Sequence, residues 1–283
     1  MSGIARRRWI AKKVSRAAVA AAFSTPLARG SHDVARVLTY HRFGRIPLDP
    51  FCVPPFEFDS HIKYVASQGL GASLDELEAF VRGDRALTKD AVVITSDDGF
   101  RSVWTNMLPI LRNYDVPAVA YVTPSLIRET DALPSHLPSD QPEHYMSWTE
   151  LGRLAEHGVA IGCHSFTHRS LAQMPLREAR EQAEKAMELF RARLGRDVLS
   201  FAYPYGTRAD YSDETARMLR EVGYTTAFTS QHGPIRKGMD PMALPRVKVE
   251  SGDPTWLFPR LCHGAMDAWR FVDQGLWRVQ LSR

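Results

Sequence analysis

The chain has 283 residues, of which 44% are hydrophobic and 24% are charged, values typical of one large globular domain. The three cysteines form no Cys-x-x-Cys pair, so neither a disulfide framework nor a cysteine zinc site is expected, and a reducing compartment is favoured. The formal net charge is +4, but much of the excess is local and the rest of the chain is near neutral, so no nucleic-acid partner is expected. Six basic residues lie within the first sixteen positions: Arg6, Arg7, Arg8, Lys12, Lys13 and Arg16.

Residues 1–35 are expected to form a basic helical segment. The alanine-rich run from Ala17 to Phe23 superficially resembles a secretion signal, but it is too short to span a bilayer. We prefer an uncleaved basic helix that packs on the domain or makes peripheral contact with an anionic membrane. This interpretation predicts a location in the cytoplasm or at the inner face of the membrane, with a cleaved, secreted or anchored form as the alternative.

The remainder of the chain alternates between strand and helix patterns. Strands are expected at residues 36–40, 91–96, 118–122, 159–163, 198–203, 224–229 and 246–249. Helices are expected at residues 58–68, 100–114, 147–157, 176–194 and 213–221, with Ser73 capping a further one and Pro109 kinking the second. Residues 43–56 and 127–145 are expected to be loops, and the aromatic-rich tail, residues 251–283, should pack on the domain. The alternation predicts a parallel α/β architecture.

The most informative stretch runs from Val92 to Gly99. An apolar, β-branched run ends in Asp97 and Asp98, which predicts a buried parallel strand with two carboxylates at its C-terminal end. In α/β folds this end of the strands carries the chemistry. Two adjacent carboxylates do not easily share one role, so a cation is expected beside one of them. A solvated Asp-Asp-Gly turn is the alternative.

A second chemical motif is His164-Ser165-Phe166-Thr167-His168, which follows the expected strand 159–163. Two imidazoles at this spacing can hold one divalent metal, although two surface histidines would give the same pattern. Adding Asp98 would complete a set of two histidines and one carboxylate that leaves positions for water and substrate. Pro204-Tyr205-Gly206 forms a third motif, a turn that could present the Tyr205 backbone N–H to an oxyanion.

Together these motifs resemble those of the NodB-homology polysaccharide deacetylases, in the family's order. The matching pieces are Thr95-Ser96-Asp97-Asp98-Gly99, His164-Ser165-Phe166-Thr167-His168 and Phe201-Ala202-Tyr203-Pro204-Tyr205-Gly206. Leu38-Thr39-Tyr40-His41 and Met146-Ser147-Trp148 resemble one branch of the family. The resemblance covers residues 36–250. It implies a single α/β domain folded as a distorted, TIM-like (β/α)7 barrel.

The resemblance also implies roles for individual residues. Asp97 would be the general base, and Asp98, His164 and His168 would bind a divalent metal, for which zinc is the first choice. The Tyr205 backbone would help the metal to form the oxyanion hole.

Two residues depart from the usual family pattern. Ser96 stands where an aromatic residue is usual, and Ala202 stands where many members carry an arginine that steadies the base. Arg246 could take the place of that arginine. In the branch that carries Tyr-His at the first strand, the early histidine is the acid, so His41 is assigned this role, with His263 the next candidate.

The sequence therefore predicts a metal-dependent hydrolase that removes acetyl groups from N-acetylated sugars of a polysaccharide or glycolipid. Hydrolysis of a non-sugar amide, a cyclic ureide or an O-acetyl ester on the same fold is the nearest alternative. A non-catalytic glycan-binding relative is a second class, but it should lack a chemical residue, and none is missing here.

Overall fold

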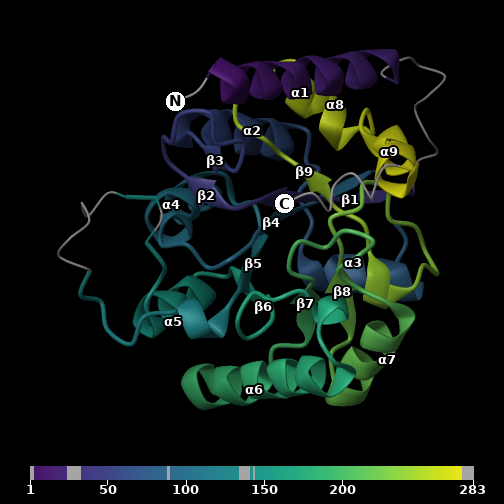
Figure 1. Cartoon of the computed structure of the whole chain (residues 1–283). Helices are drawn as coiled ribbons and strands as arrows, with labels where there is room; N and C mark the ends of the chain where they lie inside the picture. Colours follow the sequence, from purple (N-terminus) through teal and green to yellow (C-terminus); the bar gives the residue numbers. More distant parts are fainter. Residues whose placement is uncertain (1–2, 24–32, 88–89, 134–140, 143, 276–283) are drawn as a thin grey trace.

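A seven-stranded parallel sheet forms the centre of the computed structural model, which describes residues 3–23, 33–87, 90–133, 141–142 and 144–275 (Figure 1). The strand order is β8-β7-β6-β5-β4-β1-β9. The strands are β1 Ala35–Tyr40, β4 Ala91–Ser96, β5 Ala118–Val122, β6 Ala160–Cys163, β7 Ser200–Ala202, β8 Thr226–Phe228 and β9 Val247–Lys248.

The sheet curls until its two edges meet. Leu244 pairs with Phe228 of β8, and three residues later Val247 pairs with Leu38 of β1, so one short segment connects both edges. This geometry confirms the expected single-domain, distorted barrel of parallel β/α units. The carboxyl ends of all seven strands point toward one end of the barrel, where the polar motifs of the sequence follow them.

Helices cover the outer face of the sheet. They are α2 Pro55–Ser67, α4 Leu108–Tyr114, α5 Trp148–Glu156, α6 Leu176–Leu194 and α7 Asp213–Val222, whereas α3 Leu74–Arg82 packs with residues of the opposite face. The predicted cap at Ser73 is confirmed, and capping boxes join Ser73 to Glu76 and Ser147 to Glu150. Before Pro109 the expected helix changes to a π-helical stretch, Val103–Met107, because the proline removes one backbone donor.

Two parts of the chain differ from the expected pattern. The expected loop 43–56 contains a two-stranded parallel pair, β2 Arg42–Phe43 and β3 Cys52–Val53, and α2 begins within it at Pro55. Proline is favoured in the first helical turn, so a proline-rich stretch can end in a helix start as well as in a loop. The expected loop 127–145 is irregular where it is described, and residues 134–140 and 143 of it lie outside the described part.

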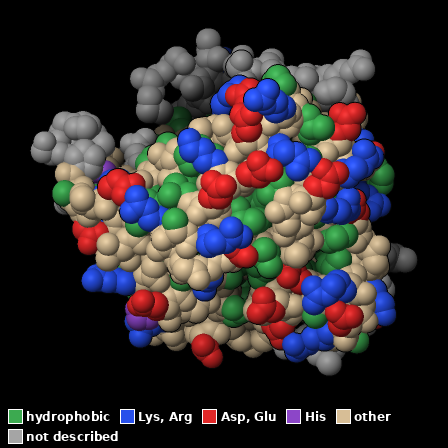
Figure 2. Space-filling model, turned by 90° about the horizontal axis from the view of Figure 1, so that it is seen from below, with side chains coloured by type: hydrophobic (Ala, Val, Ile, Leu, Met, Phe, Trp, Pro, Cys, Tyr) green, Lys and Arg blue, Asp and Glu red, His purple; other side chains and the backbone are tan. Residues whose placement is uncertain are grey.

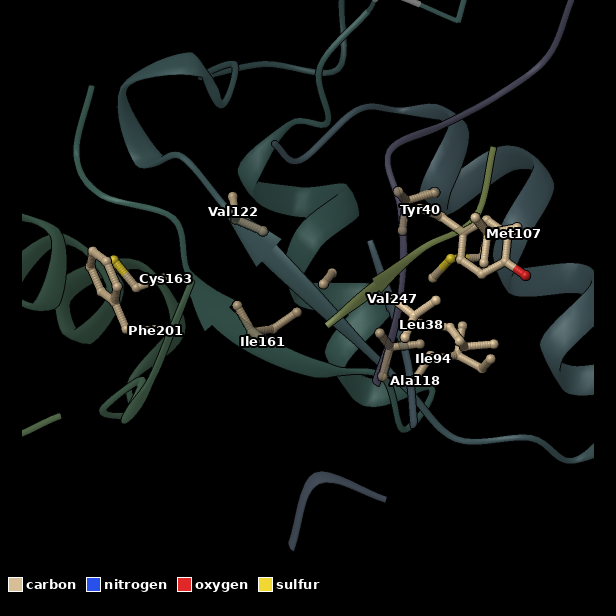
Figure 3. Packing of buried hydrophobic residues seen from close by; sticks show 14 of the residues in the cluster. Leu38, Tyr40, Ile94, Met107, Ala118, Val122, Ile161, Cys163, Phe201 and Val247 are labelled. Carbon is tan, nitrogen blue, oxygen red and sulfur yellow. The ribbon is translucent and has the colours of Figure 1, made fainter. Parts of the chain in front are cut away.

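Alternate residues of the central strands pack on opposite faces of the sheet. One large cluster joins outward-facing residues such as Leu38, Ile94 and Ala118 to the helices, and Figure 3 shows these side chains gathered on neighbouring strands. The intervening residues, among them Val93 and Val119, form a second cluster with α3. With both faces covered, the strands are apolar runs without polar alternation.

The N-terminal helix α1, Gly3–Ala22, packs on the domain. The Lys13 ammonium lies 3.1 Å from Glu250 and 2.9 Å from Asp253, and Arg16 binds Asp253 at 2.9 Å and donates to the Lys248 carbonyl at 2.9 Å. Both cations are buried. Burial alone would raise the pKa of Glu250, but Arg16, Lys12 and Lys13 hold that pKa at about 2. No described helix combines the length and hydropathy that a bilayer crossing requires.

Replacing Arg16 should destabilise the protein strongly. Arg16→Ala leaves the buried Glu250 carboxylate short of a partner, which costs about 3–5 kcal/mol of unfolding free energy. Lys12→Ala is the matched control: Lys12 binds the same carboxylate at 2.8 Å, but its side chain is 46% exposed, so its loss should cost at most about 1 kcal/mol. Urea unfolding measures both. Equal, small losses in the two variants would show that α1 is not held by this network.

The described part of the C-terminal tail packs on the domain through α8, but two of its aromatic side chains are exposed. It contains α8 Leu257–Cys262 and α9 Arg270–Gly275. Phe258 of α8 is buried, yet Trp256 is 39% and Phe271 is 62% exposed. Trp277 lies outside the described residues.

Three histidines that belong to none of the sequence motifs are buried. His61 bonds the Tyr40 hydroxyl at 3.1 Å and stacks on Phe258, while the backbone N–H and Nδ1 of His232 both bond Asp273. His144 is also buried. A lone histidine has no recognisable sequence pattern, so this burial could not be predicted from the sequence.

Candidate active site

A cavity of about 380 Å³ opens at the carboxyl ends of the strands. All seven residues singled out from the sequence line it: His41, Asp97, Asp98, His164, His168, Tyr205 and Arg246. Six of them follow β1, β4, β6 or β7, whose carboxyl ends meet because the strands are parallel, and the long Arg246 side chain reaches the same cavity from the residue before β9. The three sequence motifs therefore form one site.

Asp97 is held by a buried bidentate ion pair. Its two carboxylate oxygens each lie 2.7 Å from a guanidinium nitrogen of Arg246, and both side chains are buried. The Arg246 Nε donates to the Thr229 carbonyl, which fixes the guanidinium plane. Burial alone would raise the pKa of Asp97, but Arg246 together with His164 and His41 lowers that pKa below the ordinary value. The carboxylate is therefore ionised and oriented, as a base requires.

Asp98, His164 and His168 converge on one point. Asp98 Oδ1 lies 3.5 Å from His164 Nε2 and 3.1 Å from His168 Nε2, and one ligand atom from each residue falls within 4.8 Å of the others. His164 Nδ1 is 2.7 Å from the Ala202 carbonyl, which can only accept, so Nδ1 carries the proton. The lone pair of Nε2 therefore points toward a carboxylate oxygen.

This arrangement fits a divalent metal. Two facing acceptors repel unless a cation lies between them, and Asp98 Oδ1 is buried without an aligned hydrogen bond among the described residues. Ligands of a tetrahedral zinc with bonds of about 2.0–2.1 Å lie roughly 3.3 Å apart, close to the separations seen here. The Ala202 carbonyl supplies the outer hydrogen bond that usually fixes the tautomer of a metal-binding histidine.

The backbone is strained at three residues that line the cavity. Asp98, His168 and Tyr205 have φ values of 75°, 60° and 62°, in the left-handed region that L-residues disfavour. At Asp98 this conformation turns the second carboxylate into the site, although neighbouring strand residues point to opposite faces. Such strain persists only where the surroundings enforce it, and it is commonly found at functional sites.

The Tyr205 turn closes one side of the cavity. The Ser230 hydroxyl donates to the Tyr205 carbonyl at 2.6 Å, and the Tyr205 ring packs edge-on against His168. Gly206 is required here, because a Cβ at this position would lie 2.5 Å from the Ser230 backbone nitrogen. The close approach joins the turn after β7 to the segment that carries Thr229, the acceptor of Arg246.

His41 also lines the cavity and packs beside Phe51. Burial lowers its pKa, against the opposing effect of Asp98 and Asp97, so the resting imidazole is neutral near pH 7. The imidazole must therefore gain a proton before it can act as the acid. Ser96, the departure from the family pattern, donates to the His41 carbonyl at 3.0 Å and so helps to place this histidine.

Sequence reasoning missed six residues that also line the cavity. They are Thr39, Arg42, Phe51, Tyr203, Ser230 and Lys248. Thr39 and Lys248 could have been found, because each lies at the carboxyl end of an expected strand. Arg42 and Phe51 could not, since they belong to the unforeseen β2–β3 pair and the loop within it.

Comparison with known proteins identifies similar chains. The sequence model of the polysaccharide deacetylase family matches residues 84–227, just over half of the chain. This range contains Asp97, Asp98, His164, His168 and Tyr205, whereas His41 and Arg246 lie outside it.

Two curated relatives and one solved structure are also similar. The YxkH protein of Bacillus subtilis, assigned as a polysaccharide deacetylase, is 23% identical over 71% of this chain and 66% of its own. This chain thus aligns with just under two-thirds of that relative. The poly-β-1,6-N-acetyl-D-glucosamine N-deacetylase of Staphylococcus epidermidis is 22% identical over 77% of this chain and 79% of its own. The structure of IcaB from Ammonifex degensii superposes with a TM-score of 0.67 at 24% identity, covering 83% and 99% of the two chains.

Proposed function

The chain belongs to the polysaccharide deacetylase family, and we propose from this premise that it hydrolyses the N-acetyl groups of sugars in a polysaccharide or glycolipid. One observation carries the proposal. The buried Asp97–Arg246 pair and the Asp98, His164 and His168 set line one open cavity. A general base beside a group of metal ligands is the arrangement by which a hydrolase attacks an acyl carbon with water.

The three ligands would hold a divalent metal, most simply zinc, which supplies a Lewis acid for the acetyl carbonyl when bound. Asp97 accepts the proton of the attacking water, and Arg246 keeps this carboxylate ionised and correctly turned. The Tyr205 backbone N–H faces the developing oxyanion. His41, which is neutral at rest, first takes up a proton, the one that Asp97 accepts from water, and then gives it to the nitrogen as the carbon–nitrogen bond breaks, so acetate and a free amine leave.

Substitution of His41 tests its role as the acid. Because amide cleavage needs a protonated amine leaving group, His41→Ala should lower turnover on an N-acetyl sugar by about 10²–10⁴-fold. A phenyl acetate ester has a good leaving group and should lose far less. Arg246→Ala is the comparison variant, and it should impair both substrates because it acts through the base. Equal losses on amide and ester in His41→Ala would assign His41 a structural role.

The proposed activity is tested by product analysis on a substrate panel. The panel contains N-acetylglucosamine oligomers, an N-acetylated glycolipid, an O-acetylated sugar and a cyclic ureide, each with the zinc-loaded protein. Acetate and free amine should appear in equal amounts from the N-acetylated sugars. Release only from the O-acetyl ester or the ureide would move the assignment to that chemistry, and binding without release would indicate a non-catalytic relative.

A further inference from the structure

Exposed apolar side chains are concentrated on one side of the molecule. Nine large hydrophobic side chains are exposed among the described residues, and five of them belong to α1, α8, α9 or the residues directly beside them. These five are Ile10, Val14, Phe23, Trp256 and Phe271. Helix α1 contacts α8, and the three helices lie on the side of the molecule opposite α6 (Figure 1). Single exposed apolar residues need no explanation, but such a concentration indicates a binding surface.

The exposed charged side chains on this side are all basic. Within residues 7–23 and 254–275, every described side chain that is exposed and fully charged is basic: Arg7, Lys12, Arg260 and Arg270. The acidic groups of this region bind inward partners: Glu250, Asp253 and Asp273 have mostly buried side chains, and the half-buried Asp267 binds Arg36. The face seen in Figure 2, turned away from α1, instead carries acidic and basic side chains intermixed.

Two of these cations lie directly over exposed aromatic rings. The Arg260 guanidinium is 4.5 Å from the Trp256 ring centre, and that of Arg270 is 4.8 Å from the ring centre of Phe271. Aromatic rings paired with arginine suit the boundary between lipid headgroups and acyl chains, where a ring can enter while its cation binds phosphate.

Contacts on the inner face of α1 fix the orientation of its outer face. Lys13 and Arg16 hold the inner face through their buried ion pairs, and Trp9 packs over Gly252, where a Cβ would lie 2.5 Å from the ring. Rotation of the helix would break these contacts. Ile10 and Val14, four residues apart on one helical face, therefore point outward with Arg7 in a fixed arrangement.

We propose that this surface docks the protein on an anionic phospholipid bilayer. We define the docking face as Arg7, Ile10, Val14, Phe23, Trp256, Arg260, Arg270 and Phe271. Basic residues flanking an apolar helix face are the features of an interfacial helix that lies on anionic lipid. A second copy of the chain is a poorer partner, because symmetric pairing would bring arginines of the two copies together.

Docking in this way would place the cavity close to the membrane. The Lys12 ammonium of α1 lies 6.0 Å from the ring centre of Phe51, which lines the cavity. A glycan attached to lipid or held at the bilayer surface would then be within reach. The docking face contains none of the residues to which a chemical step was assigned, so the inference stands independently of the proposed reaction.

Co-sedimentation with vesicles tests the inference, using the full chain and two compositions. Vesicles of phosphatidylcholine mixed with phosphatidylglycerol should bind the protein, and pure phosphatidylcholine vesicles should not. Arg7→Gln combined with Arg260→Gln should lower partitioning about 30-fold, since each basic residue near the surface contributes about 1 kcal/mol. Val14→Glu should lower it at least about tenfold, because it removes an inserted apolar group.

Leu199→Glu is the matched control for Val14→Glu. Leu199 is also an exposed aliphatic residue, 43% exposed, but it lies outside the docking face. Its substitution should leave vesicle binding unchanged, and circular dichroism confirms that each variant is folded. Absence of binding to the anionic vesicles would overturn the inference, as would equal losses in Val14→Glu and Leu199→Glu. A dimer in solution that Val14→Glu dissociates, without vesicle binding, would assign the face to self-association instead.

Discussion

Asp97→Asn should lower the turnover of N-acetyl hydrolysis by about 10²–10⁴-fold while the protein keeps its metal. The substitution is nearly isosteric, and it removes the charge that accepts a proton without removing a proposed ligand. Asp97 lies 2.7 Å from Arg246 through both oxygens, so the neutral amide also leaves a buried guanidinium without its counter-charge. A loss of stability is therefore expected beside the loss of turnover, and both need measurement.

The neighbouring carboxylate provides the matched variant. Asp98→Asn changes the same functional group one residue later, but it should release the metal, because Asp98 Oδ1 is the atom that faces both imidazoles. Elemental analysis and single-turnover kinetics on the two folded variants separate the roles. Loss of metal in Asp97→Asn, with metal retained in Asp98→Asn, would reverse the assignments of base and ligand.

Removal of either metal-binding imidazole should lower turnover at least as much as Asp97→Asn does. His164→Ala or His168→Ala leaves two of the three ligands, so bound metal and turnover should fall together, turnover by about 10³-fold or more. His164 is also buried and bonds the Ala202 carbonyl, whereas His168 is more exposed. His168→Ala should therefore remain the better folded of the two.

A histidine that does not line the cavity provides the control for these two variants. His157, an exposed histidine at the end of α5, can be replaced by alanine without an expected effect on metal or turnover. Full metal content in both ligand variants would remove the metal assignment. A fall in metal content without a fall in turnover would separate the metal from the reaction.

The fold was predictable because its signals are local. Buried parallel strands such as Ala91–Ser96 are continuous apolar runs, and capping boxes such as Ser73 with Glu76 involve residues only three apart. The β2–β3 pair was not predictable, because each strand has two residues and no side-chain period can be recognised in so short a segment.

The site residues that belong to short sequence motifs were predictable. Adjacent carboxylates and a pair of histidines each stand in one short stretch, and parallel topology explains why the stretches meet. The geometry that orients them is not local. Arg246 binds Asp97 across 149 residues, and Ser96 places His41 through a backbone carbonyl, a contact that residue type alone does not encode.

The exposed aromatics of the tail were misjudged for a related reason. Composition shows that Trp256 and Phe271 are apolar, but only the packing of α8 and α9 against the rest of the domain decides which face of each helix is covered. Phe258 is buried two residues after Trp256, which is exposed.

The most direct test of the central claim is a metal titration of the chelated wild-type protein with acetate release as the readout. N-acetylglucosamine oligomers serve as substrate, and bound zinc is measured in the same samples. We predict no release from the metal-free protein, a rise in proportion to bound metal, and saturation at about one ion per chain, the capacity of a three-ligand site. Full activity in the metal-free protein, or no acetate when one ion is bound, would contradict the account.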